Sequence, residues 1–499
     1  MAGWLPRILS GLGCVLFMAL SWAPLAAWVA AAPAGDVMEG IRLAVPDARR
    51  GQVLLETVLY AAGSSALAVM IGAGGAAYCW RCSTPLAGGA SAAAVAALPF
   101  PAYLHALAWL PVFAALPSRG AGWITAGWVQ GLALSPMAFL LVRTSLERMD
   151  ARWIDAARVF GPDRRLLARV LTPTLGGAAL AAFSMAFLLT AGDPAVASLF
   201  SRNAFAMEIF ADFSATHDAA RALWLSTPLI LVGLVALEPL RRYWPNIAQR
   251  PGGNRSMQPL AGVPYLAAGA VLTVLPVLML LVAVLRQSWP PRAFWAAVPL
   301  SGRDALTSAG SAAAAGLIAL PVSLLAGRVV WRASKLGWWW MTAPLAAPGA
   351  LAGAGLIWLW NRELWWTPYG TFWMLPLAAL ARYLPVGILV AAAWRSRLDP
   401  ALLEAAAVLG PPWQAFVKVE VPLAAPGAVV GAVAVFALAL AELPATLLIS
   451  PPGSGTLSLR IYNYLHYGAS SSVAALSLCL MAGAGLAACI AWRIWRRLA

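Results

Sequence analysis

The sequence predicts an all-α polytopic membrane protein, and three observations lead to this fold class. Apolar residues make up 62% of the 499 positions and charged residues 11%, whereas a soluble domain has about 45–50% and about 25%. About twelve apolar runs approach or exceed the length needed to cross a bilayer. Two polar segments that lie half the chain apart share one residue pattern, which predicts two repeated halves.

Twelve runs are predicted to be transmembrane helices. Several contain Pro or Gly, which membrane helices tolerate when neighbouring helices satisfy the freed backbone groups. For the first run, a cleaved signal peptide is the alternative, but its length exceeds the usual apolar region of about 7–15 residues and favours a retained span. The runs lie near residues 8–31, 53–79, 86–116, 123–142, 174–191, 219–237, 264–285, 305–327, 338–360, 371–394, 424–441 and 473–492.

Positive charge predicts the orientation of these spans. Lys and Arg number 34 against 19 Asp and Glu, for a net charge of +15. About twice as many cations fall in the alternate loops taken as internal as in the external ones, which predicts both termini on the cytoplasmic side of a bacterial inner membrane. The Arg residues are spread over separate short loops, so the basic composition does not indicate nucleic-acid binding.

The repeat has an offset of 249 residues. Residues 155–173 and 404–422 each contain an acid, two alanines, a Gly and two prolines at matching positions, and Pro136 and Pro385 keep the same offset. The predicted organisation is a first half at residues 1–240, a cytoplasmic linker at 241–262 and a second half at 263–499. Six spans in each half return both polar segments to one face, which makes the repeat parallel.

The two repeated segments are predicted to be docking hairpins. In the second hairpin (residues 401–422), Ala401–Val408 favours a short helix, Gly410 a left-handed stop, and Trp413–Val419 a second short helix outside the membrane. The first hairpin (residues 152–173) has the same design. Small side chains would let the groove of another protein approach closely, and the acid would lie at its rim.

This pattern resembles the EAA loop of binding-protein-dependent ABC importer permeases. The resemblance implies the type I importer permease fold and covers nearly the whole chain. Asp155 departs from the family pattern, as a shorter acid in the Glu position. The residues that would form the ATPase-coupling helices are Asp155, Ala156, Ala157, Gly161, Glu404, Ala405, Ala406 and Gly410. The implied partners are two copies of a cytoplasmic ATP-binding ABC subunit, a periplasmic or extracellular solute-binding protein, and the lipid bilayer.

The sequence has no phosphate-binding loop of its own. A Walker A loop requires Gly-Lys-Ser/Thr, whereas Lys335 precedes Leu336 and Lys418 precedes Val419. A transport subunit that is not itself an enzyme is therefore expected, with ATP hydrolysed by another polypeptide. No cofactor and no metal site are predicted, since the three histidines lack ligand spacing.

Three charged residues are candidates for the transport pathway. Arg382 lies within the tenth predicted span, where an isolated cation is costly and is expected to face a pathway, pair with an acid or extend to the interface. Asp193 and Glu442 end equivalent spans, 249 positions apart. They are predicted to line the outer gate, with helix capping as the alternative.

The predicted cargo is iron(III). The segment Glu442–Asn463 looks like the corresponding part of fused iron(III) permeases, whose relatives carry thiamine. Thiamine, a polyamine, phosphonate and sulfate are the alternatives. Tyr462, Tyr464 and Tyr467 could serve a ferric ion, but interfacial belt residues are the favoured interpretation.

Two other classes of protein are alternative interpretations of this sequence. A secondary transporter with two parallel six-helix halves would show the same repeat, but it should carry buried acids for ion coupling, which are scarce. A polytopic enzyme would need a convergent nucleophile, acid pair or metal cluster, and the sequence shows none.

Overall fold

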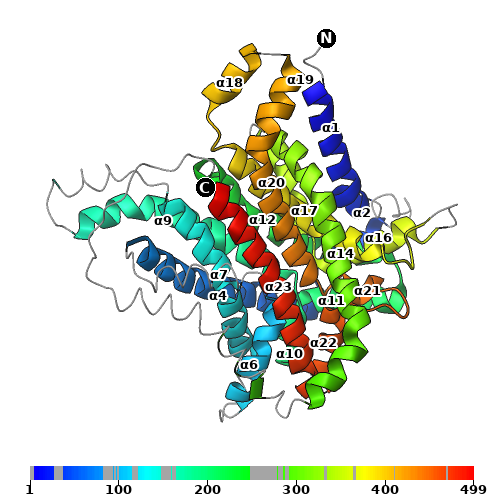
Figure 1. The fold of residues 1–499 in the computed structure, drawn as a ribbon. Coiled ribbons are helices and arrows are strands. Elements are labelled where there is room, and N and C mark those ends of the chain that lie inside the picture. The colour runs from blue at the N-terminus through cyan, green and yellow to red at the C-terminus, as the bar shows by residue number, and fades with distance from the viewer. Residues whose placement is uncertain are drawn as a thin grey trace.

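The computed structural model is all-helical, and the residues it describes contain no strand (Figure 1). Long apolar helices form the body of the molecule, and short helices cover its ends. The described residues are 5–26, 37–81, 94, 97, 100–114, 122–147, 159, 164–247, 278, 282, 285–286, 292–330, 334–362, 367–409, 411–467 and 470–498.

Helices of the predicted first half include three long ones that pack on one another, α4, α7 and α9. The helices in chain order are α1 (Leu5–Phe17), the π-helix η1 (Met18–Trp22), α2 (Ala23–Ala26), α3 (Val37–Ala44), α4 (Ala48–Arg81), α6 (Ala102–Ala114), α7 (Gly122–Leu146), α9 (Arg164–Ala191), α10 (Ala195–Leu199), α11 (Phe205–Thr216) and α12 (Ala219–Ile247).

The predicted second half has a matching trio, α14, α17 and α20, which also pack on one another. Its helices are α14 (Arg292–Val330), α15 (Lys335–Thr342), the 3-10 helix η2 (Ala343–Ala346), α16 (Gly349–Trp360), α17 (Met374–Arg395), α18 (Pro400–Leu409), α19 (Pro412–Ala415), the π-helix η3 (Phe416–Glu420), α20 (Val421–Leu440), α21 (Thr446–Ile449), α22 (Leu457–Tyr467) and α23 (Ser470–Leu498).

The helix bounds follow the offset of the sequence repeat. Adding 249 to the bounds of α4 gives 297–330, against 292–330 for α14. The same shift takes α12 to 468–496, against 470–498 for α23. Adding 249 to the last residue of α7 gives 395, which is the last residue of α17, so the helices that precede the two polar segments end at equivalent positions.

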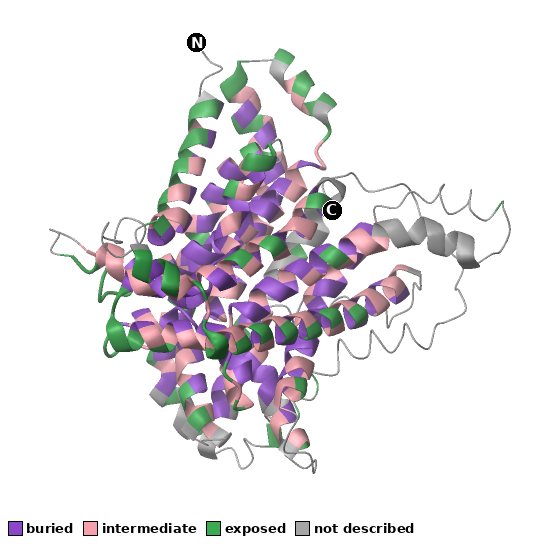
Figure 2. Cartoon of the chain, turned by 180° about the vertical axis from the view of Figure 1, so that it is seen from behind, coloured by how far each residue is buried: buried purple, intermediate pink, exposed green. Residues whose placement is uncertain are grey.

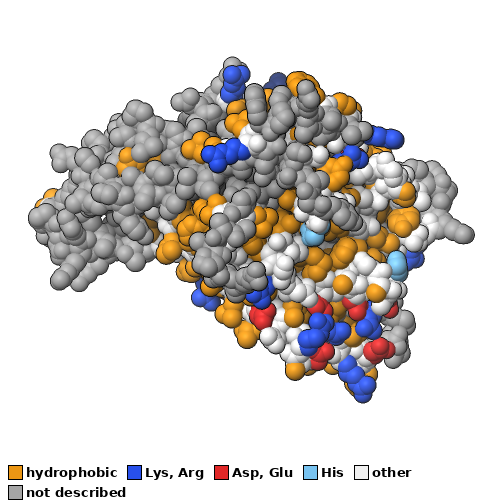
Figure 3. All heavy atoms as spheres, turned by 90° about the horizontal axis from the view of Figure 1, so that it is seen from below, with side chains coloured by type: hydrophobic (Ala, Val, Ile, Leu, Met, Phe, Trp, Pro, Cys, Tyr) orange, Lys and Arg blue, Asp and Glu red, His pale blue; other side chains and the backbone are white. Residues whose placement is uncertain are grey.

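Seven helices in the described part of the chain are long and apolar enough to cross a membrane, or eight if one bent pair counts as a span. The spans lie at Pro6–Ala26, Ala48–Trp80, Gly122–Leu146, Ala219–Trp244, Ser301–Val330, Met374–Arg395 and Pro412–Ala441. Most of the run predicted at 264–285 lies outside the described residues, so the count of twelve stays a prediction. In the part of Figure 3 that is not grey, hydrophobic side chains cover much of the surface, acidic side chains gather with basic ones near one edge, and further basic side chains lie elsewhere on this face.

The span predicted at 338–360 is not one straight helix. The chain bends by 94° between Lys335–Ala346 and Gly349–Trp360. Two prolines explain the break, since Pro344 lies in η2 and Pro348 precedes α16, so that Ala347 adopts an extended backbone with φ −77° and ψ 130°. The run predicted at 338–360 is therefore a bent pair of helices, and whether the pair crosses the membrane as one span stays a prediction.

The second hairpin also differs from its prediction. Its first helix is present as α18, but the second short helix expected at Trp413–Val419 does not end there. α19, η3 and α20 form one continuous helical span from Pro412 to Ala441. The five residues of η3 form a π-bulge, which continues the helix into α20 without a break.

The linker predicted at 241–262 begins within a helix. α12 extends to Ile247, and residues 248–262 lie outside the described part of the chain. Arg241 and Arg242 pair with Glu238 one turn earlier, at 2.5 and 2.8 Å, which stabilises this last part of the helix.

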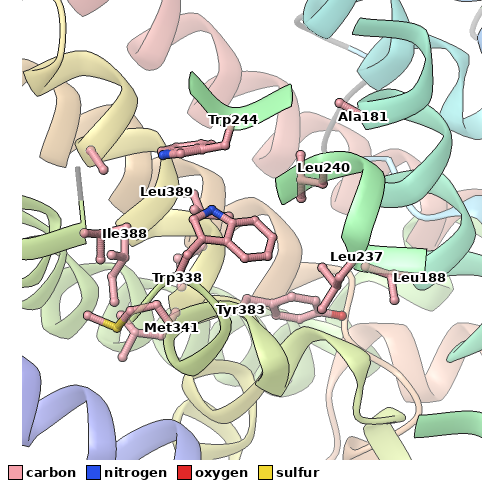
Figure 4. Packing of buried hydrophobic residues seen from close by; sticks show 14 of the residues in the cluster. Ala181, Leu188, Leu237, Leu240, Trp244, Trp338, Met341, Tyr383, Ile388 and Leu389 are labelled. Carbon is pink, nitrogen blue, oxygen red and sulfur yellow. The ribbon is translucent and has the colours of Figure 1, made fainter. Parts of the chain in front are cut away.

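One hydrophobic core joins the two predicted halves (Figure 4). Side chains of α9 and α12 pack in the same cluster as side chains of α15 and α17. The labelled members of this cluster are Ala181, Leu188, Leu237, Leu240, Trp244, Trp338, Met341, Tyr383, Ile388 and Leu389. The halves are therefore packed together through apolar side chains, and the charged groups described next lie within this frame.

Candidate functional site

A buried ion pair lies at the end of α20 and is formed by Arg382 and Glu442. Arg382 Nη1 is 3.2 Å from Glu442 Oε2, and the two side chains are only 6% and 2% exposed. Arg382 lies in the middle of α17, while Glu442 follows the last turn of α20. Burial of both charges is tolerated because each neutralises the other.

Further hydrogen bonds complete the coordination of Glu442. The Tyr383 hydroxyl donates to Oε2, and the Ala445 N–H donates to Oε1 at 2.9 Å. The carboxylate thus caps the chain segment that leads into α21, in addition to pairing with Arg382. Both interpretations made from the sequence, pairing and capping, describe contacts that are present.

Asp193 lies in the matching turn after α9 and is close to the same pair. Its Oδ1 accepts a hydrogen bond from the Ala195 N–H at 2.9 Å, at the start of α10. Its carboxylate interacts electrostatically with both Arg382 and Glu442, and burial raises the pKa of this carboxyl above its ordinary value. The structure therefore brings together all three residues that the sequence singled out as pathway candidates.

Two glycines allow the Arg382 guanidinium to reach this position. A Cβ on Gly192 would lie 3.0 Å from its Nη2, and a Cβ on Gly349 would lie 2.7 Å from its Nη1. Gly192 precedes Asp193, and Gly349 begins α16, directly after the bend. The guanidinium thus contacts backbone from both predicted halves, an arrangement that any larger residue would obstruct.

The charges of this group do not balance. Two carboxylates face one guanidinium, and the guanidinium stays protonated at any physiological pH. The group carries one net negative charge if both acids are ionised, and Arg382 has two acids, one from each half, with which to pair. With both acids ionised, such a site can attract a cation.

The second hairpin lies far from this group and is exposed (Figures 1 and 2). On α18, Glu404 and Ala405 are exposed and Ala406 is half-buried. Large apolar side chains beside them also face outward, with Val408 86% and Trp413 42% exposed. Charged and apolar groups on a protruding segment form a surface suited to another protein.

The remaining residues predicted for docking cannot be placed in the same way. Gly410 lies outside the described residues, as do Asp155, Ala156, Ala157 and Gly161 of the first hairpin. Their roles stay predictions.

Sequence reasoning missed three contributors to the buried group, namely Tyr383, Gly192 and Gly349. The adjacency of Tyr383 to Arg382 and of Gly192 to Asp193 was the available signal. The prediction that Tyr462 belongs to an interfacial belt is wrong, because its side chain is buried and its hydroxyl lies 3.0 Å from the Ser198 hydroxyl on α10. α22 packs inward against α10 and so removes this tyrosine from the interface.

Metal coordination has no visible support in the described part of the chain. No three His, Cys, Asp or Glu side chains within those residues are close enough together to hold a metal ion. The three histidines lie apart, and His105 is buried inside the first half.

Comparison with known proteins points to a transport function. The putrescine transport system permease protein PotI of Escherichia coli strain K12 is 28% identical over 212 residues, which are 41% of this chain and 74% of that protein. The chain is similar to a transport permease. The same protein from Escherichia coli O6:H1 matches with the same identity and coverage. No protein-family model matches the chain. Together with the long apolar helices, this similarity supports a multi-pass membrane protein.

Proposed function

We propose that this chain is the membrane-spanning permease of an ATP-driven, binding-protein-dependent importer. The observation that carries the proposal is the similarity to a transport permease in a chain whose second hairpin protrudes from a bundle of apolar helices. The EAA-like pattern of that hairpin supports a docking role toward an ATP-binding subunit. The protein moves a solute and makes no covalent change to it.

The proposal includes both permease halves in one polypeptide. The aligned 212 residues are most of the relative but less than half of this chain, as expected if the relative corresponds to one half. The helix bounds repeat at the offset of 249 residues. Two halves with two hairpins would engage two copies of the ATP-binding subunit on the cytoplasmic side.

The buried charged group is the proposed outer gate. Arg382, Glu442 and Asp193 connect the two predicted halves at the ends of α9 and α20, which lie opposite the second hairpin along the bundle. When nucleotide-driven motion of the hairpins separates the halves, Arg382 would leave one acid or the other. Each state then differs in its contacts, as coupling requires.

The proposed cargo is a small cation. With both acids ionised, the gate carries one net negative charge, which favours a positively charged solute over an anion. The relative is named for putrescine transport, which favours a polyamine. Iron(III), supported by the resemblance of Glu442–Asn463 to iron(III) permeases, is the second candidate, and thiamine is the third.

Reconstitution tests the function as a whole. The chain is placed in liposomes with a candidate ATP-binding subunit and binding protein from neighbouring reading frames, and ATP-dependent uptake of putrescine, ferric ion, thiamine and sulfate is measured. We expect ATP-dependent uptake of one of the cations. Transport by the purified chain without ATP would contradict the importer and favour a secondary transporter.

The hairpins can be tested separately. Replacement of Gly161 and Gly410 by Val should reduce co-purification of the ATP-binding subunit, because a Cβ at a left-handed stop reorients the following segment. Undiminished capture and uptake would contradict the docking assignment.

A further inference from the structure

An ion-pair cluster lies at the base of the second hairpin. Glu420, the last residue of η3, places its Oε1 2.6 Å from Arg328 Nε and 2.5 Å from Arg395 Nη1. Arg328 lies in the last turn of α14, and Arg395 is the last residue of α17. These three residues, called the Glu420 cluster below, join the hairpin to the two long helices beside it.

Arg328 extends the cluster to a fourth segment. Its Nη1 donates a hydrogen bond to the Pro6 carbonyl oxygen at 2.8 Å, at the start of α1. Its guanidinium carbon also lies 5.1 Å from the centroid of the Phe416 ring, within the range of a cation–π contact. α1, α14, α17 and η3 therefore meet at one point.

A second ion pair joins α17 to α20 at the far end of α20. The Glu420 cluster links α17 to the start of α20, and the Arg382–Glu442 pair links α17 to the end of α20. Between these ends, a Cβ on Gly431 would lie 2.5 Å from the Gly387 carbonyl oxygen, so the two helices are in close backbone contact. Ion pairs at both ends of α20, to the middle and to the last residue of α17, and close packing between them make α17 and α20 one unit.

The equivalent sequence positions of the predicted first half do not carry the charges of the Glu420 cluster. The positions 249 residues before Arg328, Arg395 and Glu420 are Cys79, Leu146 and Leu171. At the gate end, the position equivalent to Arg382 is Ala133. Of the charged positions that join α17 and α20, only Glu442 has a charged equivalent in the predicted first half, namely Asp193.

Side chains of the cluster are largely shielded from water. Glu420 is 12% exposed, Arg395 10% and Arg328 25%. Ion pairs removed from water hold their geometry tightly, and loss of Glu420 would leave two guanidinium groups close together without a counter-charge. A displacement of the hairpin must therefore carry the ends of α14 and α17 with it.

We propose that Glu420 is a positioning residue that transmits motion of the second hairpin through the α17–α20 unit to the Arg382–Glu442 gate, so that the second half carries most of the coupling between ATP hydrolysis and transport. This inference rests on the proposed importer function. It predicts that the two halves contribute unequally to this coupling, whereas two equivalent hairpins would contribute equally.

The test measures solute transported per ATP hydrolysed in proteoliposomes. Glu420→Gln should lower this ratio about tenfold, a coupling change of ordinary size, while capture of the ATP-binding subunit stays unchanged. Glu420→Asp, which keeps the charge, should recover part of the ratio. Lys335→Gln is the matched control, since Lys335 lies exposed at the start of α15, outside the hairpin, and should have no effect.

A triple variant covers the possibility that Glu420→Gln fails to fold. Arg328→Met, Arg395→Leu and Glu420→Leu together replace the ions by apolar side chains like those of the first half and leave no unpaired charge. The expected result is normal membrane abundance and capture with a low transport ratio. A triple variant that couples as the wild type does would overturn the inference, whereas a wild-type protein without capture or ATP-dependent uptake would instead overturn the proposed function.

Discussion

The turns that follow α9 and α20 are equivalent in position, yet their acids have different surroundings. Asp193 and Glu442 are 249 residues apart, and each accepts a hydrogen bond of 2.9 Å from a backbone N–H in the segment that leads to the next short helix. Only Glu442 is directly paired with a cation from its own half. The capping function of the acid recurs, while its ion pair is particular to the second half.

The ends of the bundle beside α11 and α22 show a second difference of this kind. In the first half, Arg49 at the start of α4 pairs with Glu208 of α11. In the second half, the polarity is reversed, since Asp304 of α14 pairs with Arg460 of α22. Each half therefore has an ion pair between a long helix and a short helix, but the long helix supplies the cation in the first half and the acid in the second.

These comparisons show that helices with matching bounds at the 249-residue offset differ in their charged partners. Backbone geometry depends on apolar periodicity and on caps, which many residues satisfy. A buried ion pair depends on two specific side chains meeting, and it differs between halves wherever one of the two is absent.

The largest expected effect follows removal of Arg382. Arg382→Ala leaves Glu442 buried without a counter-charge and should destabilise the protein by about 3–5 kcal/mol. Membrane abundance and thermal unfolding in detergent measure this loss. The double variant Arg382→Met, Glu442→Leu should recover abundance but not uptake, and recovery of both would mean that the pair has no role in transport.

Substitution of the two acids of the proposed gate, Glu442 and Asp193, should have the next largest effect, which is on uptake. Glu442→Gln should reduce uptake more than Asp193→Asn, because only Glu442 pairs directly with Arg382, while Asn at position 193 can still accept the Ala195 N–H. Uptake, normalised to membrane abundance, is the measurement. The gate assignment is wrong if both variants match the wild type in uptake and abundance.

Substitution of Gly349, which lies at the bend before α16, is expected to have a moderate effect on stability. Gly349→Ala would place a Cβ 2.7 Å from Arg382 Nη1 and 2.9 Å from the Pro444 Cβ, which should cost about 1–3 kcal/mol. Gly483→Ala in α23 is the control, since no heavy atom lies within 4 Å of its Cβ position. Thermal unfolding should separate the two variants, and equal stability would contradict the described contact.

Removal of the arginine from the Arg49–Glu208 pair or from the Arg460–Asp304 pair should have the smallest effects on stability. Arg49 is 66% exposed, so Arg49→Ala should change stability by no more than about 1 kcal/mol. Arg460→Ala should cost more, because the Asp304 side chain that it leaves behind is only 6% exposed. Thermal unfolding of both variants, with and without high salt, tests this order, and a larger loss for Arg49→Ala would reverse the comparison.

Several features of the fold were predictable from particular residues. Apolar length placed most of the long helices, since it is a local property of each segment. The spacing of Asp193 and Glu442 indicated equivalent turns, and a cation at membrane depth indicated that Arg382 needs an acid. The bend near Pro344 and Pro348 was missed because prolines are tolerated within membrane helices, as Pro385 is within α17.

The amino-acid sequence by itself determined the helical class, the offset between the halves and the exposed pattern of α18, because these depend on composition and on spacing along the chain. Only the tertiary structure decided which acid pairs with Arg382, that Tyr462 is buried, and that ion pairs join both ends of α20 to α17. Such contacts join residues far apart in sequence, and their energies depend on burial and on distances of a few ångströms, which arise only when the helices pack.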